Sequence, residues 1–507
     1  VKKEASANAA IVRSGKSSAE TVTSRCRNCG GSRPARRLQD RVLVHVAPKS
    51  NKITLAPRAA LWQGAAMLTR YLLAPAALIA AFSFTPALAT PPSKAEQAMI
   101  ATVDAEQTRH LDLLEKLVNQ NSGTRNLKGV RAVHDMLVPE FEALGFTVRW
   151  VDQAAVGRAG HFIAEHKGQK GTKRLLLIGH LDTVFELDHP FQKFERVGTD
   201  KVKGPGAADD KGGVIAMLAA LRAMHKAGTL KNANIEVVLT GDEEEAGLPL
   251  SIARADLIAA GKRADAALDF EGLARDNGND MGSIARRSAG NWTVTVTARS
   301  GHSSGIFSAA AGEGAIYPLA AILAAFRKEL PEPNLTFNVG MIAGGASAAI
   351  AESGANAEAT GKTNIIPAVA VAMGDVRALS RESIDRTAAK MREIVARPFN
   401  GGEAKLVFED KYPPMAPTPG NRALLDKLNG VNATLGLPEM AALDPLKRGA
   451  GDISFVAADV DSLVGLGPAS EGDHTAAETV DVPSLWRQAK RAALLMTRLS
   501  REPAVKR

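Results

Sequence analysis

The chain is predicted to have an α/β fold, with a mostly parallel sheet flanked by helices and an inserted βαββαβ domain. Three observations predict it. Apolar runs of strand length alternate with helical patterns up to Glu271, as in a sheet covered on both faces. From Asn291, apolar and polar residues alternate, which is typical of an antiparallel strand with one buried face. Pro413 and Pro414 then mark the return to the first domain.

The expected elements follow from these patterns in chain order. In the first domain we expect an amphipathic helix at 93–123, a helix at 130–144, a strand at 146–151, buried strands at 175–179, 235–240 and 266–270, and a helix at 214–225. In the inserted domain we expect strands near 292–297, 335–342, 368–376 and 404–409, and helices at 308–330 and 381–396.

Composition locates the basic charge of the chain at its N-terminus. The 507 residues, 45% of them hydrophobic, suffice for two or three domains with their own cores. The formal net charge is +9, but residues 1–66 contain thirteen Lys or Arg and three Asp or Glu, so the remainder carries −1. A nearly neutral body argues against a nucleic-acid partner.

The N-terminal region has the three parts of a secretory signal. A basic start at 67–70 precedes a short apolar run at 71–84 and the small-residue site Ala87-Leu88-Ala89. The run is too short to span a bilayer, so we expect no stable membrane span in the mature form. We therefore expect a non-native or mis-called extension at 1–66, a signal peptide at 67–89, cleavage near Ala89, and a periplasmic or secreted product. Both cysteines, Cys26 and Cys29, fall in the extension, and without a second pair they predict no zinc site.

One buried strand is expected to end in a histidine that could bind a metal ion. The apolar run at 175–179 is followed by His180 and, two residues later, by Asp182. A carboxylate on one imidazole nitrogen fixes the tautomer and leaves the other nitrogen for the ion. Taken alone, a His-x-Asp after a strand is more often a polar strand end.

Three acidic clusters and a late histidine strengthen the metal interpretation. Asp209 and Asp210 lie in a Gly-rich turn before a helix, residues 242–245 follow the strand at 235–240, Glu271 follows the next strand, and His474 lies in a polar loop. Each cluster alone could be a capping or solvated acidic loop. Their common position after strands favours one site, because open α/β sheets place their sites at the carboxyl ends of strands.

With these motifs in order, the chain resembles the dinuclear zinc peptidase and amidohydrolase superfamily that includes glutamate carboxypeptidase, aminoacylase and succinyl-diaminopimelate desuccinylase. The resemblance covers about 96–499 and is closest to the glutamate carboxypeptidase branch, through 209–213 and 364–367. It implies that His180 and Glu271 hold one zinc ion, that Glu244 and His474 hold the other, and that Asp209 bridges them. Nitrogen and oxygen donors without sulfur suit zinc and would also accept cobalt or manganese.

The resemblance also implies catalytic roles. Asp182 would orient His180, and Glu243 would be the general base that takes a proton from the water held between the ions. The Asp209-Asp210 peptide bond would be cis. In the inserted domain, which serves such enzymes as lid and dimer contact, His302 would stabilise the oxyanion in the neighbouring subunit's site. From the residues alone, His302 is rather a structural turn residue.

Two further positions and three departures concern the substrate. Asn364 and Arg377 match family positions that contact the substrate, although a turn cap and an exposed strand charge explain them equally well. An extra run at 346–361 would form a flap near the substrate, residues 410–413 lack the branch's arginine for the substrate carboxylate, and 449–452 reads Gly-Ala-Gly-Asp. Glutamate specificity is therefore not implied.

These inferences predict an exported, homodimeric zinc hydrolase that cleaves an amide bond next to a free carboxylate. Its substrate would be a small peptide, or an N-acyl amino acid if the chain is a deacylase. A catalytically silent binding protein on the same fold is the alternative from another class. The predicted domains are 90–288 and 414–507 for the catalytic domain, and 289–413 for the lid and dimerisation domain.

Overall fold

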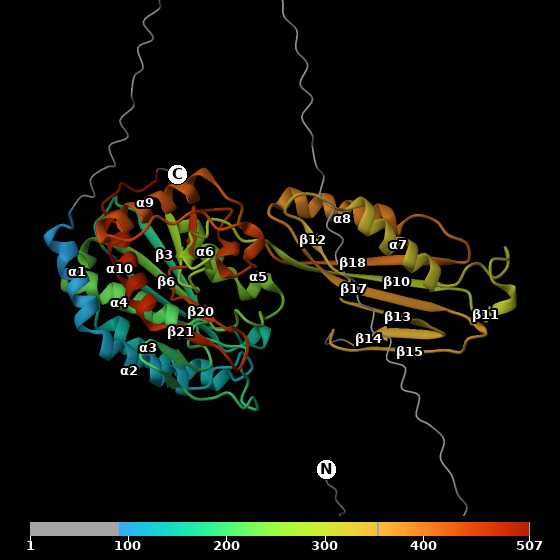
Figure 1. Ribbon diagram of the computed structural model, residues 1–507, viewed down its shortest axis with the longest axis horizontal. Coiled ribbons are helices and arrows are strands. Elements are labelled where there is room, and N and C mark those ends of the chain that lie inside the picture. Colours follow the sequence, from blue (N-terminus) through green and yellow to red (C-terminus); the bar gives the residue numbers. More distant parts are fainter. Residues whose placement is uncertain (1–90, 352–353, 506–507) are drawn as a thin grey trace, which may run out of the picture. The chain divides into compact units, whose positions relative to one another are not determined.

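The computed structural model describes residues 91–351 and 354–505, which Figure 1 shows in colour. The predicted extension, the signal peptide, its cleavage site and both cysteines lie outside these residues. Among the residues described, no helix is both long and apolar enough to cross a membrane.

The first sheet has six strands in the order β1-β2-β6-β3-β7-β19. Their bounds are β1 Thr147–Asp152, β2 Gly160–His166, β3 Arg174–His180, β6 Asn234–Thr240, β7 Ala266–Asp269 and β19 Ser462–Val464. Strands β6, β3, β7 and β19 pair in parallel, and only β2 runs against its two neighbours. The predicted mostly parallel sheet is therefore confirmed.

Helices cover both faces of this sheet, as the apolar strands require. They are α1 Lys94–Ala105, α2 Gln107–Asn119, α3 Leu127–Glu142, α4 Lys211–Lys226, α5 Leu250–Ala253, α6 Ala255–Arg263, α9 Pro419–Leu435 and α10 Val482–Leu499. On β3, Leu175 and Leu177 join a large apolar cluster with α1, α4 and α10, while Leu176 and Ile178 join a smaller cluster with α6. Fully burying each such side chain contributes about 1.5–3 kcal/mol.

The single helix expected at 93–123 is wrong, because the structure has two helices there. Helix α1 ends before Glu106, whose φ of −103° and ψ of 11° are not helical, and α2 begins after it. The carboxylate of Glu106 pairs with Arg222 and Lys226 on α4. These contacts join residues more than 100 positions apart, so no local periodicity could indicate the break.

The second sheet has the order β12-β17-β10-β18, with β13 also pairing with β17, and every pair is antiparallel. Its elements are β10 Ala289–Ala298, α7 Ile316–Glu329, β12 Thr336–Phe337, β13 Met341–Gly345, β17 Val369–Arg377, α8 Arg381–Val395 and β18 Gly402–Tyr412. Its core is separate and includes Trp292, Val294 and Val296 from alternate positions of β10. Helix α7 begins at Ile316, eight residues later than expected.

The remaining strands are short and lie outside the two large sheets. They are β4 Glu195–Val197, β5 Lys201–Lys203, β8 Arg275–Asp276, β9 Asn279–Asp280, β11 Gly301–His302, β14 Ser347–Ile350, β15 Ala357–Thr360, β16 Ile365–Ile366, β20 Ser470–Glu471 and β21 Thr479–Asp481. Within the extra run at 346–361, β14 and β15 pair antiparallel, and both contact β13 or β17.

Candidate metal centre

The predicted ligands lie at one edge of the first sheet. His180 is the last residue of β3, Glu243 and Glu244 follow β6, and Glu271 follows β7. Strand β3 pairs in parallel with both β6 and β7, so the three carboxyl ends are adjacent. The structure therefore brings together side chains that are up to 91 positions apart in the sequence.

Asp209 lies between two imidazoles. One of its carboxylate oxygens is 3.0 Å from His180 Nε2, and the other is 3.0 Å from His474 Nε2. His474 Nε2 is also 3.2 Å from a carboxylate oxygen of Glu244. Possible ligand atoms of His180, Asp209 and Glu244 lie within 4.8 Å of one another, and this nitrogen and oxygen donor set fits zinc.

The Asp209 loop is held by Glu478, a residue that the sequence did not single out. The carboxylate of Glu478 accepts hydrogen bonds from the backbone N–H groups of Gly206, Ala208 and Asp209, at 2.8–3.2 Å. In the sequence, the signal for Glu478 was an acid four residues after His474, which a solvated loop would explain as well.

The Asp209-Asp210 peptide bond is cis, as the resemblance implied.

Asp182 is buried and contacts more than the histidine it was expected to orient. Its carboxylate accepts hydrogen bonds from the N–H groups of Glu243 and Glu244, at 3.0 and 3.1 Å, and from the Thr124 hydroxyl. His180 Nδ1 is 3.1 Å from the Asp182 carbonyl oxygen and 3.4 Å from its carboxylate. Asp182 thus joins the histidine at the end of β3 to the acidic loop after β6.

Glu271 is held by arginines that the sequence analysis missed. Arg286 Nη1 is 2.5 Å from Glu271 Oε2, and Arg448 Nη2 is 3.6 Å from the same oxygen. Among the described residues, Glu271 Oε1 accepts no hydrogen bond, which leaves it available to a ligand. Arg286 also binds the carbonyl oxygens of Gly449 and Ala450. No local pattern around Arg286 pointed to these partners.

The electrostatics of the site favour a cation. Burial, followed by repulsion from Glu271, raises the pKa of Glu243 well above its ordinary range, and the same two causes raise the pKa of Asp269 to about 7. Hydrogen bonds to Asp209 and Glu244 raise the pKa of His474 to about 11. Carboxylates that resist ionisation and a histidine that retains its proton indicate excess negative charge, which bound metal ions would neutralise.

A buried arginine holds the loop that carries Glu243. Arg254 is 2.6 Å from the Asp242 carboxylate, 2.7 Å from the Asp452 carboxylate and 3.0 Å from the Asp242 carbonyl oxygen. Its side chain is 0% exposed. Because both acids are also buried, the three charges depend on one another for compensation.

Replacing Arg254 by methionine is expected to destabilise the protein by about 3–5 kcal/mol, because two buried carboxylates lose their cation. Chemical denaturation followed by circular dichroism measures this loss. The matched control is Arg263→Met, which removes a half-exposed arginine paired with Glu236 at 2.6 Å and should change stability by about 1 kcal/mol at most. Equal effects of the two substitutions would contradict the role given to Arg254.

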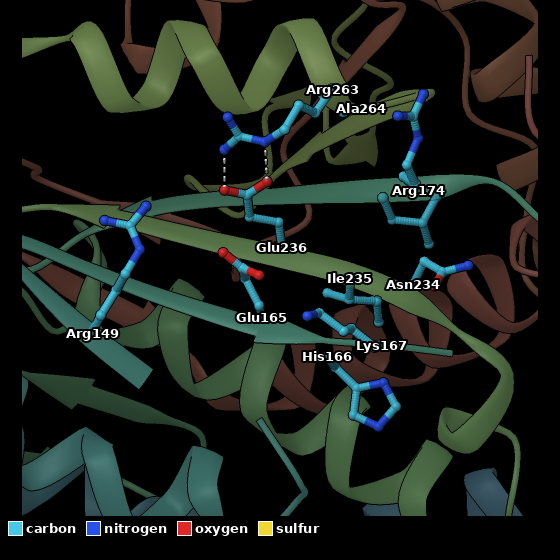
Figure 2. A pocket seen from close by; sticks show the side chains of 11 residues that line it. Arg149, Glu165, His166, Lys167, Arg174, Asn234, Ile235, Glu236, Arg263 and Ala264 are labelled. Atoms are coloured by element: carbon cyan, nitrogen blue, oxygen red, sulfur yellow. Dashed lines mark hydrogen bonds and ion pairs between the residues drawn. The ribbon is translucent and has the colours of Figure 1, made fainter. Parts of the chain in front are cut away.

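The Arg263–Glu236 pair borders a cavity at the other end of the sheet (Figure 2). The cavity has about 430 Å³ and is lined by the first residues of β3 and β6, away from the metal ligands. Its arginines already have acidic partners, since Arg174 pairs with Asp265 and Arg149 lies 3.5 Å from Asp256. None of the predicted site residues lines it.

The three site residues predicted between 289 and 413 fall into two groups. His302 on β11 is exposed, pairs in register with Ile365 on β16, and thus lies beside Asn364. Arg377 is the last residue of β17, at the other end of the sheet, where it is 3.0 Å from Asp375. The structure therefore brings His302 and Asn364 together but separates them from Arg377.

Comparisons with known proteins find relatives along most of the chain. Residues 176–498 match the profile described as peptidase family M20/M25/M40. Carboxypeptidase G2 from Pseudomonas sp. (strain RS-16) is 28% identical over 433 residues, which are 83% of this chain and 96% of that protein. Succinyl-diaminopimelate desuccinylase from Nitrosospira multiformis is 25% identical over 391 residues, 74% of this chain and 94% of that protein. The solved structure of aminopeptidase PepT from Bacillus cereus shares the fold, with a TM-score of 0.62, 19% identity, and coverage of 78% of this chain and 99% of that one.

Proposed function

The chain belongs to peptidase family M20/M25/M40, and from this premise we propose that it is an exported dinuclear zinc hydrolase cleaving an amide bond next to a free carboxylate, as a carboxypeptidase or dipeptidase does. One observation carries the proposal. The two carboxylate oxygens of Asp209 face His180 and His474 at 3.0 Å each. A carboxylate placed between two imidazole ligands can bridge two ions.

The ligand assignment is the one that the family resemblance implies, and the contacts of Asp209 support it. In the proposal, His180 and Glu271 bind one zinc ion, Glu244 and His474 bind the other, and Asp209 is shared. Glu271 would offer Oε1, because Arg286 already holds Oε2. Two bound ions would supply Lewis-acid activation of the attacking water and of the scissile carbonyl, and cobalt or manganese could replace zinc.

The protein's own residues move the protons and hold the substrate. Glu243 accepts the proton of the attacking water and later passes it to the leaving amine. Asp182 fixes the loop that carries Glu243, through the N–H groups of Glu243 and Glu244. Arg377 would contact the carboxylate next to the scissile bond, and Asn364, which lies beside His302, would contact a substrate in the partner's site.

The metal assignment is tested by metal content and activity together. Purified mature protein should bind two zinc equivalents per subunit and lose its activity on treatment with a chelator. His474→Ala should abolish activity and leave most of the fold intact, because His474 is exposed in a loop. Mass spectrometry of metal content, a hydrolysis assay and circular dichroism measure the three outcomes. Full activity in metal-stripped protein would contradict the proposal.

A second activity, N-acyl-amino-acid deacylation, is favoured by the relationship to succinyl-diaminopimelate desuccinylase, which covers 94% of that relative. The same metal site would serve both reactions, and the substrate pocket would distinguish them. A panel of dipeptides and N-acetyl amino acids separates the two activities. Membership of a hydrolase family, together with the presence of the candidate carboxylate ligands and Glu243, argues against a catalytically silent binding protein.

Export is proposed from the signal-like pattern at 67–89. The N-terminal residue of protein recovered from the periplasm should be Thr90, because the small-residue site ends at Ala89. Edman sequencing or intact-mass measurement of the recovered protein checks this. A cytoplasmic product that still contains Cys26 would contradict export and would restore the basic extension as part of the protein.

We further propose that the protein is a homodimer in which His302 acts in the partner's site. The support is the position of His302 relative to the points where the chain enters and leaves the second sheet. Those points, Ala289 and Tyr412, pair with each other at the Arg377 end of β10. The nine residues of β17 separate the two ends by roughly 26 Å, farther than a histidine side chain reaches.

A further inference from the structure

The loop after β6 holds Glu243 by its backbone and leaves its carboxylate free. The N–H of Glu243 donates to the Asp182 carboxylate at 3.0 Å, and its carbonyl oxygen accepts a hydrogen bond from the Tyr412 hydroxyl at 2.8 Å. Among the described residues, the Glu243 carboxylate itself makes no hydrogen bond. The position of this carboxylate therefore depends on how firmly the Glu243 backbone is held.

The Tyr412 hydroxyl belongs to a directed chain of hydrogen bonds. Arg254 Nη2 donates to the hydroxyl at 3.3 Å, and the hydroxyl donates its own proton to the Glu243 carbonyl. Arg254 cannot reverse this direction, because it has only donors and is fixed by Asp242 and Asp452. Because Arg254 is charged, its hydrogen bond polarises the Tyr412 hydroxyl and makes that hydroxyl a stronger donor to the Glu243 carbonyl.

Tyr412 reaches the loop from the second sheet. It is the last residue of β18, where the pairing with β10 shifts by one residue, so that Tyr412 instead of Lys411 lies opposite Ala289. Such a bulge re-aims the side chains that follow it. The ring of Tyr412 packs on Phe455, with 5.0 Å between ring centroids, which fixes the hydroxyl over Glu243.

We propose that Tyr412 is a positioning residue for the general base, which it holds through the backbone carbonyl of Glu243. The inference rests on the proposed role of Glu243. It gives a function to the position at which the sequence lacks the arginine of the glutamate carboxypeptidase branch. The end of β18 then positions the general base through its backbone.

The test removes only the hydroxyl. Tyr412→Phe should lower kcat about three- to tenfold, the effect of one lost hydrogen bond, with KM and zinc content unchanged. The substrate is the fastest compound of the dipeptide and N-acetyl amino acid panel. Hydrogen exchange of the peptide covering 242–247 should become faster, because the loop loses one of its ties. Tyr317→Phe, which removes the hydroxyl of a tyrosine that is 56% exposed on α7, should change neither quantity.

A double-mutant cycle separates positioning from a general structural effect. If Tyr412 acts through Glu243, Tyr412→Phe should leave the residual rate of Glu243→Gln unchanged. The same loss factor in both backgrounds would overturn the inference, as would unchanged kcat and exchange in Tyr412→Phe alone. Full activity of Glu243→Gln would instead refute the proposed base, and the role of Tyr412 with it.

Discussion

Glu243→Gln should lower kcat by about 10²–10⁴ while both zinc ions remain bound. The substitution keeps the size of the side chain and removes its ability to accept a proton. Because the contacts of Glu243 to Asp182 and Tyr412 are made by its backbone, they survive the substitution. Steady-state kinetics and metal analysis on the same preparation measure the two effects.

Glu244→Gln is the matched control, because it makes the same chemical change at the next residue. Glu244 is 3.2 Å from His474 and is part of the candidate ligand cluster, so its amide should weaken the binding of one metal ion. Metal content should therefore fall in Glu244→Gln and not in Glu243→Gln. The reverse result would show that base and ligand are assigned the wrong way round.

Mixed dimers should recover about half of the wild-type activity from two subunits that are each nearly inactive. Glu243→Gln lacks the base, and His302→Ala lacks one oxyanion donor, a loss of roughly 10²–10³ in rate. In the heterodimer, the subunit with intact Glu243 receives intact His302 from its partner. One site in two is then complete.

The arrangement in which His302 acts within its own subunit predicts a lower heterodimer activity. If His302 served its own subunit, every site of the heterodimer would lack either the base or the oxyanion donor, and only the background of the two homodimers would remain. Separate tags on the two variants and two affinity steps yield the heterodimer. A monomeric mature protein would contradict the proposal before any kinetics are measured.

The sequence by itself predicted the fold class and placed His180, Glu244 and Glu271 at or after the ends of strands. Both rest on short-range patterns. The alternation of Leu175 to Ile178 between two apolar clusters follows from the period of a strand, and His180 stands at the end of that run. Parallel pairing then brings the strand ends together, so motifs far apart in the sequence could be assigned to one site before their distances were known.

The tertiary structure alone decided which groups hold these residues in place. Glu478 binds the N–H groups of the Asp209 loop from 269 positions away, Arg286 occupies one oxygen of Glu271, and Tyr412 reaches the carbonyl of Glu243 across 169 positions. The break between α1 and α2 also involves a distant segment, because the carboxylate of Glu106 pairs with Arg222 on α4. Each contact depends on the exact approach of two distant segments. Periodicity and motif spacing report only on neighbours along the chain, so they cannot specify such contacts.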